Sequence, residues 1–171
     1  MKAAVKQLKT KKRGSGLFKV TTSKYRGIAV SDKPNTAAEA KGQNGIAVSS
    51  ARSSVALATD HLGIAVITNE PSVASAQGPF GIAAALGEGC ASASGDNGVA
   101  IACREGLACA DHATATAVAV DVAARGVLGA TLVLVDTVYR KSVVVRVDGE
   151  TVEPDTLYRI GPVSGVPEAV C

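Results

Sequence analysis

Aromatic residues are scarce in this 171-residue chain, which has two Phe, three Tyr and no Trp. Only Phe80 falls between residues 27 and 119. An interior built with so few large rings leaves little space between its facing walls. Long apolar runs are also missing, because no stretch reaches the roughly 20 residues that span a bilayer as a helix. We therefore expect no membrane among the partners.

Acidic residues are missing from the beginning of the chain. No Asp or Glu precedes Asp32, whereas nine of the 18 Lys and Arg residues lie within residues 1–26. This charge asymmetry indicates a basic segment on an acidic body. The segment has no apolar core of the kind that a secretory signal needs. We expect the protein in the cytoplasm of a host cell or in a virion.

Cysteine is present four times but never as CxxC, so a zinc site is not predicted. In a cytoplasmic setting Cys90, Cys103, Cys109 and Cys171 are expected to be reduced thiols. Cys90 and Cys109 stand where neighbouring segments have Val, Ile or Leu, which favours a role as small apolar side chains.

Residues for catalysis or metal binding are few. His61 and His112 each follow an Asp in a turn, and we expect them about 14 Å apart, which is too far for one metal site. The Asp residues hold no common register, as calcium-binding rolls with nine-residue repeats would require. A period of six, as in β-helical acyltransferases with a catalytic histidine, is not found. The sequence therefore predicts no catalytic residue, no metal, no cofactor and no enzyme.

A five-residue motif repeats between Gly27 and Ala117, mostly every nine residues, as in GIAVS at 27 and 45, SVALA at 54 and GVAIA at 98. Its third place is always alanine, at Ala29, Ala38, Ala47, Ala56, Ala65, Ala74, Ala83, Ala91, Ala100, Ala108 and Ala115. Alternation within each row predicts a strand, and a fixed period predicts stacked coils. We expect an all-β, parallel β-roll with two rows to a coil, about 5.5 coils and about 26 Å long.

The two faces of each row differ, because residues two and four share one face and residues three and five the other. We expect alanine in the narrow interior. Glu39 then faces outwards on the even rows, and a stripe of Ile and Val covers the odd rows. The alternative places positions two and four inside, with Glu39 buried and the alanines in contact with a partner. In the first arrangement the stripe is an oligomer interface, closing most simply as a homotrimer. Its residues are Ile28, Val30, Ile46, Val48, Ile64, Val66, Ile82, Val99 and Ile101.

The chain divides into three parts: residues 1–26 form the basic N-terminal segment, 27–130 the roll, and 131–171 a cap and tail. The segments TLVLVDTV, SVVVRVD and TLYRI are rich in Val and Leu and predict a small antiparallel meander. Such a cap would protect the open end of the roll from aggregation.

The rows GIAVS, SVALA and GVAIA resemble the head repeats of trimeric autotransporter adhesins, which are left-handed parallel β-rolls. A closer likeness is to small phage and prophage proteins of unknown function. It rests on VLGATLVLVD and VRVDGETVEPDTLYRI, after a similar alanine-rich repeat. This resemblance implies a phage-type, non-enzymatic oligomer that associates with itself, with phage particle proteins or with host proteins.

Nucleic acid is a further expected partner. Basic side chains near the N-terminus could neutralise phosphates, and Phe18 and Tyr25 could stack on bases. The candidate contacts are Lys9, Lys11, Lys12, Arg13, Lys19, Lys24 and Arg26. A solubilising tail, or an arm that docks on the acidic body of a neighbouring subunit, is the alternative. We expect a non-catalytic binding or assembly protein, with a host-directed binder, such as a defence inhibitor or a nucleotide sponge, as the alternative function.

Overall fold

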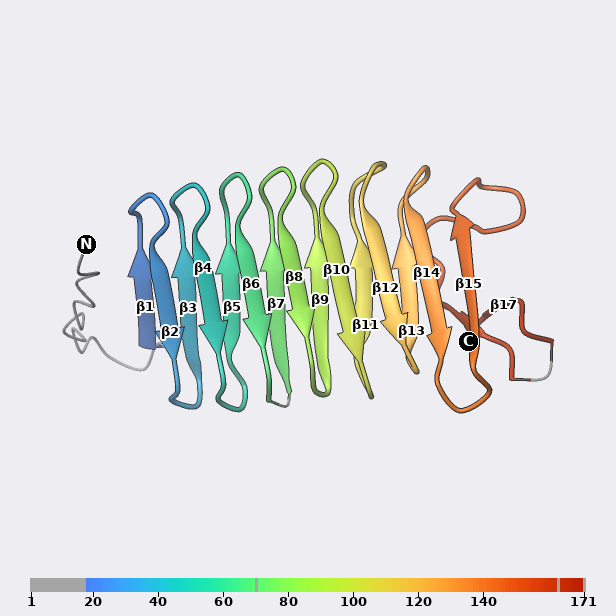
Figure 1. The fold of residues 1–171 in the computed structure, drawn as a ribbon, viewed down its shortest axis with the longest axis horizontal. Helices are drawn as coiled ribbons and strands as arrows, with labels where there is room; N and C mark the ends of the chain where they lie inside the picture. The colour runs from blue at the N-terminus through green and yellow to red at the C-terminus, as the bar shows by residue number, and fades with distance from the viewer. Residues whose placement is uncertain (1–17, 70, 163, 171) are drawn as a thin grey trace.

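The computed structural model describes residues 18–69, 71–162 and 164–170 of the chain. These residues form a two-walled β-solenoid without a helix, which confirms the expected all-β roll (Figure 1). Residues 1–17 of the basic N-terminal segment lie outside the described residues. In the described part of the chain, no helix is long and apolar enough to cross a membrane.

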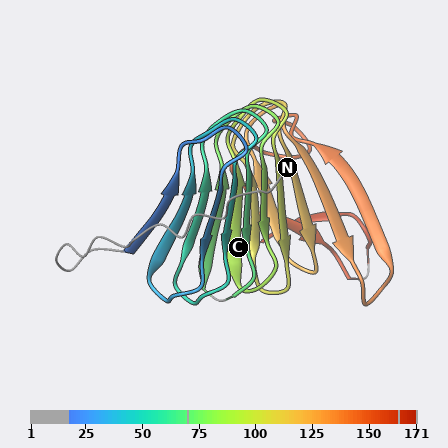
Figure 2. The same ribbon diagram turned by 60° about the vertical axis from the view of Figure 1, so that its left-hand side comes forward.

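Two sheets make up the walls of the solenoid, and successive strands alternate between them (Figure 2). Wall A contains, in spatial order, β1 (Phe18–Thr22), β3 (Thr36–Ala40), β5 (Val55–Ala58), β7 (Ser72–Ala76), β9 (Gly89–Ala93), β11 (Leu107–Ala110), β13 (Ala123–Gly126), β16 (Tyr158–Ile160) and β17 (Pro167–Ala169). Wall B contains β2 (Ile28–Ser31), β4 (Ile46–Ser49), β6 (Ile64–Ile67), β8 (Ile82–Ala85), β10 (Val99–Cys103), β12 (Thr116–Val120), β14 (Thr131–Asp136) and β15 (Lys141–Arg146), ending at the edge strand β15.

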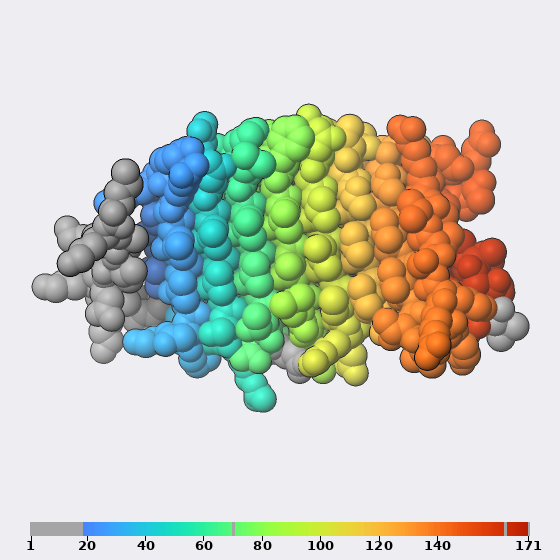
Figure 3. Space-filling view, viewed as in Figure 1, coloured from blue at the N-terminus to red at the C-terminus, as the bar shows by residue number. Residues whose placement is uncertain are grey.

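Seven coils stack along the long axis of the molecule, visible as successive bands of colour in Figure 3. Wall A has nine strands, of which β16 and β17 pair antiparallel, and wall B has eight, of which β15 does. Each wall therefore keeps seven parallel strands, more than the expected 5.5 coils. The solenoid extends beyond residues 27–130 at both ends, because β1 pairs with β3 and β14 pairs in parallel with β12. Neither β1 nor β14 contains the alanines that mark the repeat.

The last predicted row was placed wrongly. The sequence pattern put Ala115 at its third place, but the strand begins at Thr116, and Ala117 lies opposite Ala100. Ala115 is nevertheless buried, in the turn before the strand. The repeat shortens in this region, and the run ATATAVAV offers two registers that differ by two residues and keep the same face inside.

Alanine fills the interior between the walls, as expected. The alanines from Ala29 to Ala108 at the third place of the rows are all at most 1% exposed. In the first three rows of wall B the fifth place carries Ser31, Ser49 and Ile67, which are also buried. Ile67 is accommodated because Gly89 lies beside it: a Cβ at Gly89 would come within 2.8 Å of Ile67 Cδ1. The alternative arrangement, with positions two and four inside, is therefore wrong.

The corners of the solenoid depend on a residue with positive φ directly before the next row. Asn44 and Leu62 occupy this place in successive coils, each with φ 56°. The following residue is glycine because space at the corner is short: a Cβ at Gly63 would lie 2.7 Å from the Cβ of Ala58. This geometry explains why odd rows begin with glycine.

The C-terminal end of the solenoid closes with larger side chains. Leu132 and Leu134 of β14 are buried where earlier coils have alanine, together with Val147 and Tyr158. β15 continues wall B and β16 continues wall A, so the expected meander is divided between the walls. The backbone N–H of Glu153 donates to the Tyr158 hydroxyl over 2.9 Å, which anchors the connecting loop.

Candidate functional site

An apolar stripe covers the outer side of wall B. Residues at the second and fourth places point away from the alanine interior, and strand pairing aligns them in two columns across the sheet. All nine residues of the predicted interface belong to these columns: Ile28, Ile46, Ile64, Ile82 and Val99 in one, and Val30, Val48, Val66 and Ile101 in the other. We call this surface the apolar stripe.

The apolar stripe continues further than the sequence indicated. Its second column passes through Ala84 and Ile101 to Val118, Val133 and Val144, so it crosses all eight strands. Val118 was missed because the row at 113–117 was placed two residues too early, and Val133 and Val144 because residues 131–171 were assigned to the cap. The alternation in TAVAV and TLVLV was the available signal, since it keeps the period of two that the earlier rows have.

The size of the apolar stripe can be estimated from strand geometry. Seven spacings of about 4.8 Å give the fourth-place column a length of about 34 Å, and four spacings give the second-place column, which ends at Val99 beside Thr116, about 19 Å. At about 7 Å of width per column, the stripe covers about 370 Å². This area matches the largest apolar patches that monomers expose, which are often functional. The stripe is open in the single chain, where Ile28 is 62% exposed and Val144 66%. Further apolar side chains widen it at its C-terminal half, namely Leu86, Cys103, Val120 and Val135.

Polar residues interrupt the outer side of wall A by contrast. Its fourth-place column runs through Glu39, Leu57, Ser75, Ser92, Cys109 and Arg125. Glu39 faces outwards as predicted, yet it is only 5% exposed because lysine side chains cover it. The Glu39 carboxylate lies 2.5 Å from Lys19 Nζ and 3.6 Å from Lys41 Nζ. Burial raises the pKa of Glu39, but the hydrogen bond and charge of Lys19, with Lys41, outweigh burial and hold the pKa below its usual value.

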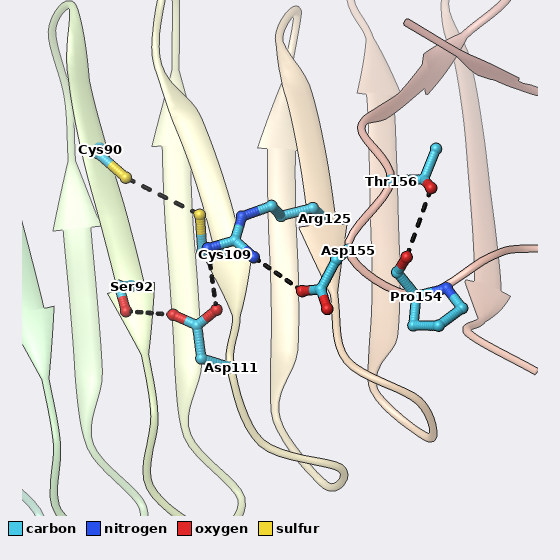
Figure 4. A network of polar contacts seen from close by, with 8 residues as sticks. All are labelled: Cys90, Ser92, Cys109, Asp111, Arg125, Pro154, Asp155 and Thr156. Atoms are coloured by element: carbon cyan, nitrogen blue, oxygen red, sulfur yellow. Dashed lines mark hydrogen bonds and ion pairs between the residues drawn. The ribbon is translucent and has the colours of Figure 1, made fainter. Parts of the chain in front are cut away.

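Two thiols meet on wall A next to an arginine (Figure 4). The Sγ atoms of Cys90 in β9 and Cys109 in β11 are 3.9 Å apart. In Figure 4 the Arg125 guanidinium lies beside the Cys109 sulfur. Its position is fixed by two carboxylates, Asp155 at 2.9 Å and Asp111 at 3.3 Å. The two cysteines were expected to be simple apolar side chains, but the fold brings them together in a polar network.

The electrostatics of the pair favour a single thiolate. The hydrogen bond with Cys109 lowers the pKa of Cys90 to about 7, and although burial opposes the shift, the charge of Arg125 adds to it. The same contact with Cys90 and burial raise the pKa of Cys109. The pair therefore gives up one proton near neutral pH and holds the other.

A groove of about 520 Å³ lies on wall A where its strands begin. Val55, Val73, Cys90 and Leu107 form the outward-facing column along its floor, and Glu88 and Glu105 add negative charge to its lining. Cys90 is partly exposed, whereas Cys109 is 2% exposed. The groove thus gives solvent access to one sulfur of the pair.

The predicted nucleic-acid contacts are only partly described. Lys9, Lys11, Lys12 and Arg13 lie outside the described residues, as does the Phe18 side chain. Lys19 is engaged with Glu39, whereas Lys24 and Arg26 are exposed at a corner before β2. Arg26 lies over the Tyr25 ring, 5.1 Å from its centre. Nucleic-acid binding by these residues stays a prediction.

The histidines are not brought together with further metal ligands. His61 packs edge-on against Phe80 with ring centres 5.5 Å apart, and His112 contacts Thr114. Across residues 18–69, 71–162 and 164–170, no group of three or more His, Cys, Asp or Glu side chains could hold a metal ion.

The comparisons with known proteins give no relative for this chain. No protein-family model matches it, and no curated protein and no solved structure matches it either. Two surfaces of the solenoid carry its distinctive chemistry, namely the apolar stripe on wall B and the thiol pair with its polar network on wall A.

Proposed function

We propose that this protein is a non-catalytic assembly and binding protein that associates with copies of itself through the apolar stripe, as a homotrimer. One observation carries the proposal: the fourth-place column of wall B stays apolar across all eight strands, whereas the fourth-place column of wall A is interrupted by Glu39, Arg125 and two serines. This difference between the two walls favours wall B as the surface that contacts another copy.

The energetics favour a contact between copies. Burial of the stripe's apolar side chains between copies would stabilise the assembly by about 25 cal/mol per Å² of apolar surface removed from water. A standard interface buries roughly 800 Å² on each partner, so the stripe would form the apolar centre of the contact and its polar margins the rest. Three copies with their stripes turned to a common axis would bury the surface in a closed assembly. The resemblance to phage and prophage proteins adds a particle or host component as a further proposed partner.

A matched pair of lysine substitutions tests this proposal. Ile82 on wall B and Val73 on wall A lie at the second place of successive rows and are similarly exposed, at 38% and 41%. We expect I82K to dissociate the assembly to a monomer of 17.1 kDa, because a desolvated lysine is costly in an apolar interface. V73K places the same charge on the other wall and should leave the assembly intact.

Light-scattering mass after size exclusion is the measurement, with circular dichroism to show that both variants keep the β-solenoid. Dissociation by V73K but not by I82K would contradict the assignment of the interface to wall B. Equal masses for both variants and the wild type would do so as well. A dimeric wild type that I82K dissociates would keep the interface and overturn the threefold arrangement.

A second candidate function, nucleic-acid binding, is favoured by the exposed corner at Lys24, Tyr25 and Arg26. A planar guanidinium over an aromatic ring next to a lysine offers both stacking and phosphate contacts. Binding of a single-stranded oligonucleotide should weaken steeply with salt and should be reduced by Arg26→Glu. Binding that is unaffected by salt and by this variant would exclude the corner as the site.

A further inference from the structure

The thiol pair on wall A has a geometry that suits a ligand better than a disulfide. Cys90 lies opposite Leu107 in the register, so Cys109 is displaced from it by two residues along the neighbouring strand. With strands about 4.8 Å apart and a rise of about 3.3 Å per residue, the two Cα atoms are about 8 Å apart. A disulfide needs Cα atoms within about 7 Å, so closing one would require the backbone to move.

The neighbouring coils resist such a movement. β9 is hydrogen-bonded to β7 on one side and to β11 on the other, and Ala91 between the cysteines is completely buried in the interior. Drawing the sulfurs from 3.9 Å to the disulfide bond length of about 2.05 Å would strain this stacking. The fold therefore keeps two sulfurs close together without letting them bond to each other.

A soft cation between the sulfurs needs no such strain. A metal–thiolate bond is about 2.3 Å long, so two bonds in line span about 4.6 Å, and the sulfurs need to move apart by only about 0.7 Å from the observed 3.9 Å. Thiolates select soft ions such as Cu(I). No third ligand is available in the described residues, so an ion that requires four ligands does not fit. We propose that Cys90 and Cys109 bind one soft monovalent cation of the Cu(I) type between their sulfurs.

Arg125 completes the electrostatics of this site. Two thiolates and one monovalent cation carry a net charge of −1, and the guanidinium beside Cys109 offsets it. Asp111 and Asp155 hold the guanidinium in place from the other side. Each sulfur that binds the ion gives up its proton, so a fully protonated pair releases two protons for each ion bound. The groove at Cys90 provides the entry path.

Titration of the reduced full-length protein with Cu(I) in competition with a chromophoric Cu(I) chelator tests the proposal. We expect one strongly bound ion per chain. Cys90→Ser and Cys109→Ser should each lower the affinity at least about 100-fold, because a ligand is lost, whereas Arg125→Gln should lower it about 10-fold with unchanged stoichiometry. Cys103→Ser on wall B and Cys171→Ser are the matched controls, and each should stay within about twofold of the wild type.

Several results would overturn the proposal. An equal loss of affinity in Cys103→Ser or Cys171→Ser would place the ion elsewhere, and so would undiminished binding in Cys90→Ser. Cys90 is partly exposed, so its serine variant serves if Cys109→Ser fails to fold. Treatment of the metal-free protein with a thiol oxidant, followed by peptide mass analysis, should show no Cys90–Cys109 disulfide in the folded chain. Ready formation of that disulfide would refute the argument from strand spacing.

Discussion

Replacing Gly95 by Ala would place a methyl group between two stacked coils. The added Cβ would lie 2.1 Å from the carbonyl oxygen of Gly78 and 2.4 Å from its carbonyl carbon, both part of the backbone of the preceding coil. Relief of this contact requires the corner to open by about 1 Å, since overpacked sites respond by backbone shifts that cost about 1–3 kcal/mol. The shift also loosens the hydrogen bond from Phe80 N–H to the Asp96 carbonyl, 2.7 Å long, worth about 1 kcal/mol.

Alanine also lowers the conformational entropy of the unfolded chain, which stabilises the folded variant by about 0.4–1 kcal/mol. We therefore expect Gly95→Ala to lower the free energy of unfolding by about 2–3 kcal/mol. Chemical denaturation followed by circular dichroism at one protein concentration measures the change. Ser94→Ala, at an exposed position of the same corner, is the control and should stay within about 0.5 kcal/mol of the wild type. A change of that small size in Gly95→Ala would refute the close stacking of the coils at this corner.

Three further perturbations test the corners and the charged side of wall A. Leu62→Asn should raise the free energy of unfolding by about 0.5–1 kcal/mol, because asparagine tolerates the positive φ of this exposed residue better than leucine does. The reciprocal Asn44→Leu should lower the free energy of unfolding by a similar amount, and thermal melts measure both changes. Glu39→Gln should destabilise the protein by about 1 kcal/mol at neutral pH. The pKa of Glu39 is lower in the folded chain than the unfolded value of 4.5. Ionised Glu39 therefore stabilises the fold above pH 4.5, and this stabilisation is lost as the pH falls through the folded pKa. In denaturation at acid pH, the free energies of unfolding of the wild type and of Glu39→Gln should converge. A Leu62→Asn variant less stable than the wild type, or a Glu39→Gln deficit that persists at acid pH, would contradict these explanations.

The interior was predictable from the sequence because alanine recurs at one place in every row. A period of two then fixes that face as the inner one, and Ala65 or Ala83 could be placed without a structure. The ends were harder to predict. β1 has Val20 where the repeat has alanine, and β14 has Leu132, so both strands lack the mark by which the other rows were found.

The thiol pair could not be found from the row pattern alone. Cys90 stands at the second place of its row and Cys109 at the fourth, so their contact depends on the stagger between neighbouring strands. Their separation of 19 residues equals the coil of 17 residues that joins Cys90 to Leu107, plus two more along the strand. A spacing of one coil plus two residues predicts that the two cysteines are diagonal neighbours on the same face of the sheet.

The light-scattering mass of the wild-type chain across a dilution series tests the central claim most directly. Burial of the apolar stripe between copies predicts a mass of three times 17.1 kDa, about 51 kDa, that persists at high salt because the contact is apolar. A mass of 17.1 kDa at every concentration, with the β-solenoid intact by circular dichroism, would contradict self-association through wall B.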